Sequence, residues 1–379
     1  MNIVIVGPAY PYRGGIADFS ERLAHEFLHE GHSVRLVTFT LQYPSFLFPG
    51  TTQYAEGPAP TDLTITRSLN SVNPISWLRT ARSIRAAQPD VVIFAYWMAF
   101  MAPAYGFIAS RLRRKGIRCV ALVHNMLPHE RTILDKLFAP YFVRRMDGFS
   151  TLSQSVCDDV RSLTKENKPV TLCPHPLYDN FGPAVSREEA IAHLGLDAGM
   201  RYILFFGLIR DYKGLDLLME AFADVRLQAR NIRLLVAGEF YSGEERYLEL
   251  ERTLGLQGRI VWTRRFIPSD EVRHYFAAAD IVAQPYRTAT QSGVTQIAYH
   301  FGRPMLVTNV GGLAEIVPDG RVGYVVAPQA QAIADALVDF LDAGREPSFT
   351  AATQVEKAKY TWSNMTRALL TAAHAQIEQ

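Results

Sequence analysis

The residues with the clearest chemical meaning are two cations and a short run of small polar side chains. Arg210 and Lys213 stand three residues apart in a polar loop after the apolar stretch 202–206. Residues 289–293, which include Ser292, precede a helical pattern of apolar residues. Small polar residues at that position cap a helix and leave its first N–H groups unpaired. Two cations with such a helix start suit a phosphate or diphosphate group.

Neighbouring residues extend this predicted anion site. The backbone N–H groups of Ser292 and Gly293 would bind the anion, and Val294 after them belongs to the same predicted donor-binding set. Glu239 directly follows another buried strand, and a second Gly-rich turn at 311–312 precedes Glu315. The sequence contains no Asp-x-Asp pair, so we expect the two cations, rather than a metal, to neutralise a diphosphate. The simplest alternative is that these segments are two ordinary loops of an α/β sheet.

Strands and helices alternate along the whole chain, which predicts an α/β protein with parallel sheets. Residues 2–6 predict a strand that is apolar after Asn2, 16–30 an amphipathic helix and 33–39 the next strand. Between the first strand and the helix, Gly14 and Gly15 would let the backbone approach a ligand closely. The dinucleotide pattern G-x-G-x-x-G is absent, so this is a Rossmann-like opening without that fingerprint.

The following segments lead to a histidine at the end of a strand. Residues 40–75 lack periodicity, and we expect a long loop there with perhaps a short strand. Residues 91–110 carry no charge and approach the length of a membrane span, but a proline and a glycine interrupt them. A buried strand, a loop and a short helix explain them better. The strand 119–123 then delivers His124 to the edge where ligands bind, either to contact a substrate or as a structural histidine.

A proline-rich crossover divides the pattern into two similar halves. With 379 residues, the chain is long enough for two domains with separate cores. We expect a first domain at 1–175, a hinge at about 174–183 and a second domain at 184–361. The terminal helix, at about 362–379, would have Ser363 as its cap.

The composition, 48% hydrophobic and 20% charged, is typical of a soluble globular protein. Residues 1–174 carry 19 Lys and Arg against 13 Asp and Glu, while the remainder carries 20 against 24. Three cysteines form no metal or disulfide pattern, so a reducing cytoplasm is the simplest location. The N-terminus enters a strand at once and does not read as a signal peptide.

The segment 130–146 alternates basic and aromatic side chains. Its members are Arg131, Lys136, Phe138, Tyr141, Phe142, Arg144 and Arg145. A basic amphipathic helix can lie on an anionic membrane surface, so a peripheral contact with the inner face of a membrane stays open. A helix packed on the sheet with a solvated charged face is the simpler interpretation.

The sequence resembles the retaining glycosyltransferases of family 4 over nearly its whole length. The most specific segments are AADIVAQPY at 278–286 followed by FGRPMLVTNVGGLAEIV at 301–317. FGLIRDYKGLDLLMEAF at 206–222 looks like the family's diphosphate-binding strand, loop and helix. The opening at 14–34 is similar to that of the family's acceptor domain. The resemblance implies the GT-B fold, in which two Rossmann-like domains face across a cleft and the terminal helix packs back on the first.

This resemblance also implies roles for particular residues. It assigns Arg210 and Lys213 to the diphosphate, places His124 near the reacting sugar and gives Glu315 the hydroxyls of the donor sugar. The donor would be a UDP- or GDP-sugar, and the acceptor a glycan or a lipid-linked molecule in polysaccharide or lipopolysaccharide assembly. Because the leaving diphosphate is thought to accept the acceptor's proton, no dedicated general base is expected. Neither a metal, another cofactor nor a nucleic acid is implied.

One segment departs from the family pattern. The family usually carries two glutamates within the helix region, but Ala289 and Ile297 stand at those positions here. Gln291 and Gln296 lie close by and could bind a sugar or ribose hydroxyl as neutral partners. The missing carboxylates leave a second hypothesis open, a catalytically weak or non-catalytic scaffold of the same fold that binds sugar nucleotides. An epimerase on the same scaffold is a third, although such enzymes bring carboxylates into their cleft.

Overall fold

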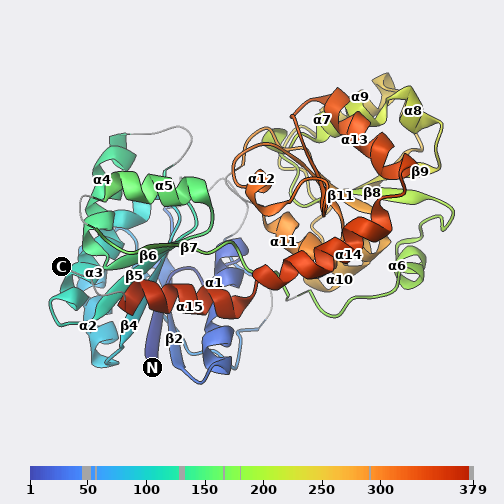
Figure 1. Cartoon of the computed structure of the whole chain (residues 1–379). Helices are drawn as coiled ribbons and strands as arrows, with labels where there is room; N and C mark the ends of the chain where they lie inside the picture. The colour runs from blue at the N-terminus through green and yellow to red at the C-terminus, as the bar shows by residue number, and fades with distance from the viewer. Residues whose placement is uncertain are drawn as a thin grey trace. The chain divides into compact units, whose positions relative to one another are not determined.

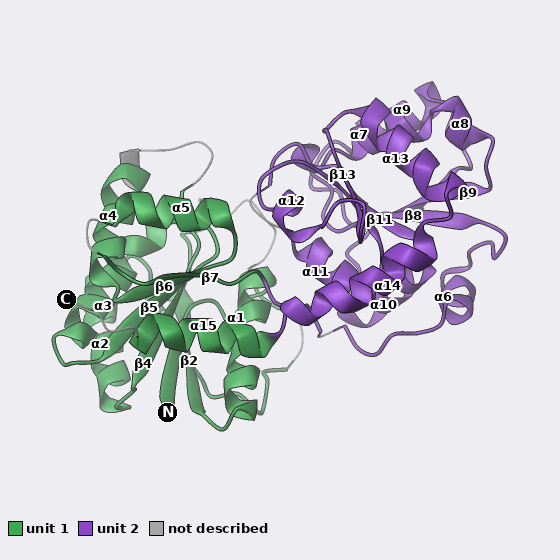
Figure 2. Ribbon diagram, in the orientation of Figure 1, with its two compact units in different colours: residues 1–174, 362–379 green, residues 175–361 purple. Residues whose placement is uncertain are grey.

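The computed structural model describes residues 1–44, 53–55, 58–127, 133–164, 167–179, 181–289 and 292–374. The chain divides into two compact units (Figure 2). Unit 1 comprises Met1–Pro174 together with Trp362–Gln379, and unit 2 comprises His175–Thr361. The division at Pro174 falls where the sequence places the start of its proline-rich hinge.

Unit 1 is built on a seven-stranded sheet in the order β3-β2-β1-β4-β5-β6-β7, and every pairing is parallel. Apolar residues on both faces of the central strands are buried, because helices cover the sheet on both sides. The strands are β1 Asn2–Val6, β2 Ser33–Leu41, β3 Ile65–Asn70, β4 Val91–Tyr96, β5 Arg118–Val123, β6 Gly148–Thr151 and β7 Val170–Leu172.

The helices of unit 1 fall into two layers (Figure 1). Alternate strand residues pack into two separate cores, one under α1 and α15 and the other under α2, α3, α4 and α5. The helices are α1 Gly15–His29, α2 Pro74–Ala86, α3 Ala102–Arg113, α4 Ile133–Arg145, α5 Gln154–Leu163 and α15 Trp362–His374, with a short turn η2 Ala99–Met101 before α3.

Unit 2 has a six-stranded parallel sheet in the order β10-β9-β8-β11-β12-β13. Its strands are β8 Arg201–Phe206, β9 Ile232–Ala237, β10 Ile260–Thr263, β11 Ile281–Gln284, β12 Met305–Thr308 and β13 Gly323–Val326. The longer helices are α6 Arg187–Leu194, α7 Leu215–Phe222, α9 Glu244–Thr253, α10 Ser269–Ala278, α11 Gly293–His300, α13 Ala330–Asp342 and α14 Glu346–Glu356. The short ones are η3 Asp211–Lys213, α8 Val225–Gln228, α12 Leu313–Ile316 and η4 Lys357–Lys359.

The predicted α/β architecture with two parallel sheets is confirmed. The uncharged stretch at 91–110 forms β4, η2 and most of α3, and no described helix is long and apolar enough to cross a membrane. The region at 40–75, expected to be mainly loop, contributes the end of β2 and the six-residue β3. The predicted Ser363 cap is wrong, because α15 already begins at Trp362 and Ser363 lies within its first turn.

Candidate functional site

The carboxyl edge of the unit 2 sheet holds most of the predicted donor residues. Strand β8 lies between β9 and β11, so the chain order reverses at β8, and parallel sheets bind ligands at such a point. The loop after β8 passes directly over the end of β11, since a Cβ added to Gly214 would lie 2.0 Å from the Pro285 carbonyl oxygen. Gly214 also has φ +66°, so the loop needs glycine at this contact.

Lys213 reaches the centre of this edge. A Cβ built on Gly207 would lie 3.3 Å from Lys213 Nζ and 3.8 Å from a methyl of Val294. The ammonium, Gly207 and the first turn of α11 therefore lie together. Burial lowers the pKa of Lys213, and the nearby Arg210 charge lowers it further while Tyr212 opposes them. A bound anion would offset both unfavourable effects.

Arg210 is held by an aromatic ring rather than by a carboxylate. Its guanidinium carbon lies 4.2 Å from the ring centroid of Tyr241. The loop that carries Tyr241 is fixed to the Arg210 loop by Ile209 N–H to Glu239 O at 2.8 Å and Tyr241 N–H to Ile209 O at 3.0 Å. Arg210 Nε is buried and has no hydrogen-bond partner among the described residues. An unpaired, buried guanidinium donor is unusual in a folded protein.

The helix start at α11 behaves as the small polar residues predict. Ser292 accepts a hydrogen bond from Val294 N at 3.3 Å, and its hydroxyl lies 3.2 Å from that of Tyr286. The ring of Tyr286 lies 5.6 Å from Lys213 Nζ, so the same side chain lies next to both Lys213 and the cap of α11. Gly293 opens the helix close to Tyr178. Gln291 lies outside the described residues.

Gln296 does not reach the surface of this edge. Its side chain is completely buried, and both amide atoms lack a hydrogen-bond partner in the described structure. Its neighbour Thr295 instead donates to Gln284 Oε1 at 3.0 Å, which ties α11 to the end of β11. Buried amides normally form hydrogen bonds, so burying Gln296 without a partner lowers the stability of the fold. The side chain has no evident structural role.

The two predicted carboxylates are exposed. Glu239 follows β9, where its backbone oxygen holds the Arg210 loop, and its side chain is solvent-exposed. Glu315 is exposed on the short helix α12, after the turn at Gly311 and Gly312. Their predicted contacts with the donor stay predictions.

The structure adds an ion-pair cluster that sequence patterns do not reveal. Asp216, at the start of α7, accepts two hydrogen bonds from Arg287 at 2.8 and 3.0 Å and one from Arg246 at 2.9 Å. Arg287 also donates to Asp211 O at 3.0 Å, and its backbone N–H donates to Tyr212 O at 2.7 Å. The loop that carries both site cations is thus fastened to the segment after β11.

The unit 1 residues form a second, separate set. His124 follows β5 and is buried, with its ring 5.0 Å from Phe19 of α1 in an edge contact. Phe19 in turn lies 4.8 Å from Trp362, so the returning helix α15 supports the ring that packs on His124. Gly14 precedes α1 with φ +113°, and Gly15 is its exposed first residue.

Comparisons with known proteins show the family of this chain. The model of Glycosyltransferase Family 4 matches residues 13–177, and that of Glycosyl transferases group 1 matches residues 200–343. The D-inositol 3-phosphate glycosyltransferase of Nocardioides sp. is 31% identical over 320 residues, which cover 75% of this chain and 68% of that protein. The chain belongs to glycosyltransferase family 4. The relative of that name from Corynebacterium diphtheriae is 29% identical, but the match spans only 47% of its length.

Solved structures place this family 4 chain in the GT-B fold. Sucrose-phosphate synthase from Thermosynechococcus elongatus superposes with a TM-score of 0.74 and 18% identity, covering 97% of this chain and 98% of the other. Anabaena HepE in complex with UDP gives a TM-score of 0.76 with 15% identity, covering 99% and 100%. At these identities the likeness concerns the fold.

The departure from the family 4 glutamates has a structural counterpart. Ile297, at the second of those positions, is buried in the apolar core of unit 2. Ala289, at the first, is partly buried against the same core. Neither position can therefore offer a polar group to a donor. Among the described residues, no group of three or more His, Cys, Asp or Glu side chains could hold a metal ion.

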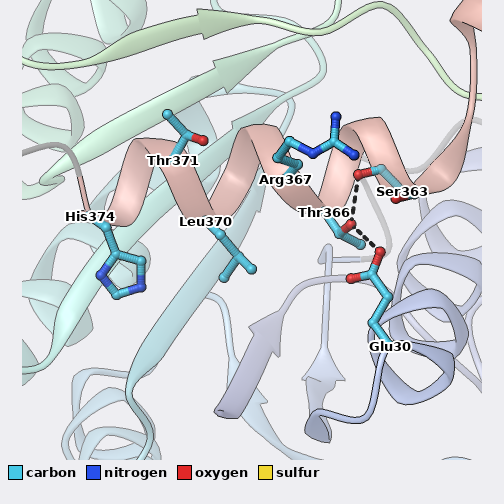
Figure 3. A pocket seen from close by; sticks show the side chains of 7 residues that line it. All are labelled: Glu30, Ser363, Thr366, Arg367, Leu370, Thr371 and His374. Atoms are coloured by element: carbon cyan, nitrogen blue, oxygen red, sulfur yellow. Dashed lines mark hydrogen bonds between the residues drawn. The ribbon is translucent and has the colours of Figure 1, made fainter.

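A hollow of about 380 Å³ lies away from the predicted residues, on the outer side of α15 (Figure 3). Thr366 Oγ1 lies 2.7 Å from Glu30 Oε1 and 3.0 Å from Ser363 O, which ties the end of α1 to the first turns of α15. The hollow is lined by Glu30, Ser363, Thr366, Arg367, Leu370, Thr371 and His374. None of these residues was predicted to bind the donor. We therefore place the candidate donor site at Arg210 and Lys213 of unit 2.

Proposed function

We propose that this family 4 glycosyltransferase moves a sugar, with retention and without a metal, from a nucleotide-diphosphate donor to a hydroxyl acceptor. The observation that carries the proposal is the placement of Lys213 Nζ beside Gly207 and the first turn of α11. Arg210 adds a second cation with a free buried donor. These groups would stabilise the negative charge that develops on the leaving diphosphate.

The proposed reaction needs no separate base. The bond between the sugar's anomeric carbon and the diphosphate oxygen breaks while the acceptor hydroxyl attacks from the same side. The hydroxyl proton passes to the departing phosphate oxygen. Arg210, Lys213 and the backbone amides of Ser292 and Gly293 would hold the leaving group throughout. In unit 1, His124 would contact the reacting sugar.

The partners and location belong to the same proposal. A UDP- or GDP-sugar is the donor, and a glycan or lipid-linked molecule of cell-envelope polysaccharide assembly is the acceptor. The relatives are named for D-inositol 3-phosphate, so that compound belongs in the acceptor panel. All three cysteines are buried free thiols, which suits a reducing cytoplasm.

Calorimetric titration with UDP, GDP and ADP, with and without magnesium, tests the donor site. We expect one nucleotide to bind at micromolar concentration with no dependence on magnesium, and we expect Arg210→Ala to abolish this binding. Arg226→Ala is the matched control, because Arg226 is an exposed arginine of the same unit that pairs with Asp224 and Asp335. Binding of none of the three nucleotides would contradict the proposal.

A non-catalytic scaffold that binds sugar nucleotides is the second candidate. Burial of Ile297 in the core favours it, since no carboxylate replaces the missing family glutamate there. Slow hydrolysis of the bound donor separates the two functions, because a transferase releases its sugar to water at a measurable rate. A protein that binds the donor but never turns it over is the scaffold. For a transferase, nuclear magnetic resonance of the first product tests retention at the anomeric carbon.

A further inference from the structure

The connections that leave strands β1, β2 and β4 of unit 1 are rich in aromatic rings. Their starting points lie at the carboxyl edge of the sheet, where parallel sheets bind ligands. Five of these rings, which we call the aromatic edge, belong to Tyr12, Tyr43, Tyr54, Trp97 and Phe100. No Phe, Tyr or Trp occurs in the described stretches that lead into the strands at the opposite edge, which are 30–32, 58–64, 87–90, 114–117, 146–147 and 167–169. The rings therefore gather at the edge that binds ligands.

Backbone contacts fix Tyr54 beside the loop that follows β1. Two hydrogen bonds, of 2.8 and 3.0 Å, join residues 53–55 to residues 11–13. Tyr12 and Tyr54 stand opposite each other in an antiparallel bridge, with their ring centroids 5.4 Å apart. The position of the Tyr54 ring is thus set by the strand end that carries Tyr12.

The remaining rings continue from this pair across the edge. Phe39, near the end of β2, lies 6.1 Å from the ring of Tyr12 and 6.2 Å from that of Trp97. Trp97 Nε1 donates to the hydroxyl of Tyr43 at 2.7 Å, and the ring of Tyr43 lies 6.3 Å from that of Phe100. Aromatic contacts therefore link three connections of the sheet into one cluster.

Only the inner part of this cluster belongs to the core. Phe39 and Tyr12 are 0% and 3% exposed, whereas Tyr54 is 48% exposed. The other members of the aromatic edge are half-buried. The face of an aromatic ring is negative and attracts positively polarised C–H groups. Such C–H groups line the apolar face of a saccharide ring, so exposed aromatic rings held on a rigid base suit that ligand.

The same edge is poorly suited to a phosphate. Arg13 is the one Lys or Arg among the described residues that follow β1 to β6, which are 7–14, 42–44, 71–73, 97–101, 124–127 and 152–153. The corresponding edge of unit 2 carries both Arg210 and Lys213 in one loop. In unit 1 the first turn of α1 contains Asp18, whose negative charge opposes an anion at that helix start.

We propose that the aromatic edge binds the acceptor, and that this acceptor presents a neutral saccharide ring rather than a phosphorylated polyol. The apolar face of the saccharide would stack on Tyr54, with Tyr43 and Trp97 beside it. The inference rests on the proposed transfer of a sugar to a hydroxyl acceptor and names the chemical class of that acceptor. A free glycan and a lipid-linked glycan both offer such a ring.

Saturation-transfer nuclear magnetic resonance of the full chain, with and without UDP, GDP and ADP, tests the inference. The neutral probes are lactose, maltose and mannobiose, and the charged probe is D-inositol 3-phosphate. We expect at least one neutral disaccharide to receive saturation on its ring C–H groups and to bind more tightly than the charged probe. Its affinity should stay unchanged when salt rises from about 50 to about 500 mM, because no ion pair holds it.

Variants of the exposed ring show whether stacking is responsible. Tyr54→Ala should weaken disaccharide binding roughly 2- to 10-fold, and Tyr54→Phe, which keeps the ring, should bind like the original chain. Phe107→Ala is the matched control, because Phe107 is a half-buried ring of α3 that packs on Trp77 of α2. It should bind the disaccharide like the original chain, and melting curves should show all three variants folded.

Methyl and octyl glucoside separate a free glycan from a lipid-linked one. Equal affinities for the two would indicate recognition of the saccharide alone, and tighter binding of octyl glucoside that still falls in Tyr54→Ala would indicate a lipid-linked saccharide. Octyl glucoside binding that is the same in Tyr54→Ala, with no methyl glucoside bound, would overturn the inference, because the alkyl chain would then be the ligand.

Two further results would overturn the inference. One is tighter, salt-sensitive binding of D-inositol 3-phosphate than of every neutral probe. The other is the absence of saturation transfer to any neutral probe. Nucleotide titration of the same samples keeps the two proposals apart. If a nucleotide binds while the neutral probes do not, the acceptor class is wrong and the proposed transferase stands, whereas failure to bind any nucleotide contradicts the proposed function itself.

Discussion

Arg287 Nη1 lies 2.8 Å from Asp216 Oδ1 and Arg287 Nη2 lies 3.0 Å from Asp216 Oδ2, in a bidentate pair between α7 and the segment after β11. Burial raises the pKa of Asp216, but hydrogen bonding and charge from Arg287, with Arg246, outweigh it and hold the pKa below its usual value. The pair fastens the loop of Arg210 and Lys213 to the strand end that leads into α11.

Asp216→Asn should weaken nucleotide binding without contacting the nucleotide. The substitution leaves Arg287 without its charged partner, so the loop of Lys213 loses a fixed position. We expect UDP affinity to fall roughly tenfold, about 1.4 kcal/mol, in calorimetric titration. Asp224→Asn is the control, since Asp224 pairs with Arg226 away from the site. Equal UDP affinities of the two variants would show that the Asp216–Arg287 pair does not position Arg210 and Lys213.

Tyr241 should support Arg210 through its ring alone. Replacement by Phe keeps the aromatic face at 4.2 Å from the guanidinium, whereas Leu removes it. A cation–π contact is worth about 0.5–2 kcal/mol. Tyr241→Leu should therefore lower kcat/KM for donor turnover by roughly 2- to 30-fold, while Tyr241→Phe stays near the original value. If Phe and Leu reduce turnover alike, the hydroxyl rather than the ring matters.

Gly207→Ala should damage the anion site itself. The backbone there has φ +95°, and the added methyl would lie 3.3 Å from Lys213 Nζ. Gly255→Ala is the matched control, because Gly255 has φ +64° but nothing lies within 4 Å of its added methyl. Both should lose about 1 kcal/mol or more of stability from the strained φ, measured by chemical denaturation. We expect the loss of UDP binding in Gly207→Ala alone, and its survival there would remove Gly207 from the ligand's path.

His175 should make the folded protein sensitive to acid. Burial lowers the pKa of His175 to about 4, and its Nδ1 lies 2.6 Å from the Pro176 carbonyl oxygen. Because the unfolded chain takes up this proton near pH 6.5, stability should fall as pH drops from about 6.5 to about 4, by up to roughly 3 kcal/mol.

Thermal unfolding from pH 7 to 4 checks this expectation. The Tm of His175→Gln should depend less on pH than that of the original chain. His29→Gln, at an exposed position, should leave the pH dependence unchanged. If the Tm of His175→Gln still falls steeply as the pH drops, other titrating groups cause the loss of stability.

Local patterns along the chain predict the strands, most helices and the cap of α11. The cap at Ser292 could be predicted because a cap is a contact between residues two or three positions apart. Arg210 and Lys213 were readable because a short turn keeps them together. The wrong Ser363 cap lies at a helix end, where packing rather than local preference decides.

Tertiary structure alone decided the contacts that give these residues a common site. Asp216 and Arg287 are 71 positions apart, and they meet because β8 and β11 are neighbours whose carboxyl ends share one edge. The same arrangement brings Tyr286 to both Lys213 and Ser292. It also buries Gln296, which sequence reasoning placed in the donor site. Periodicity and helix caps depend on residues that are close in the sequence, so the sequence alone predicts them. Contacts between distant residues depend on strand order and packing, which no local pattern encodes.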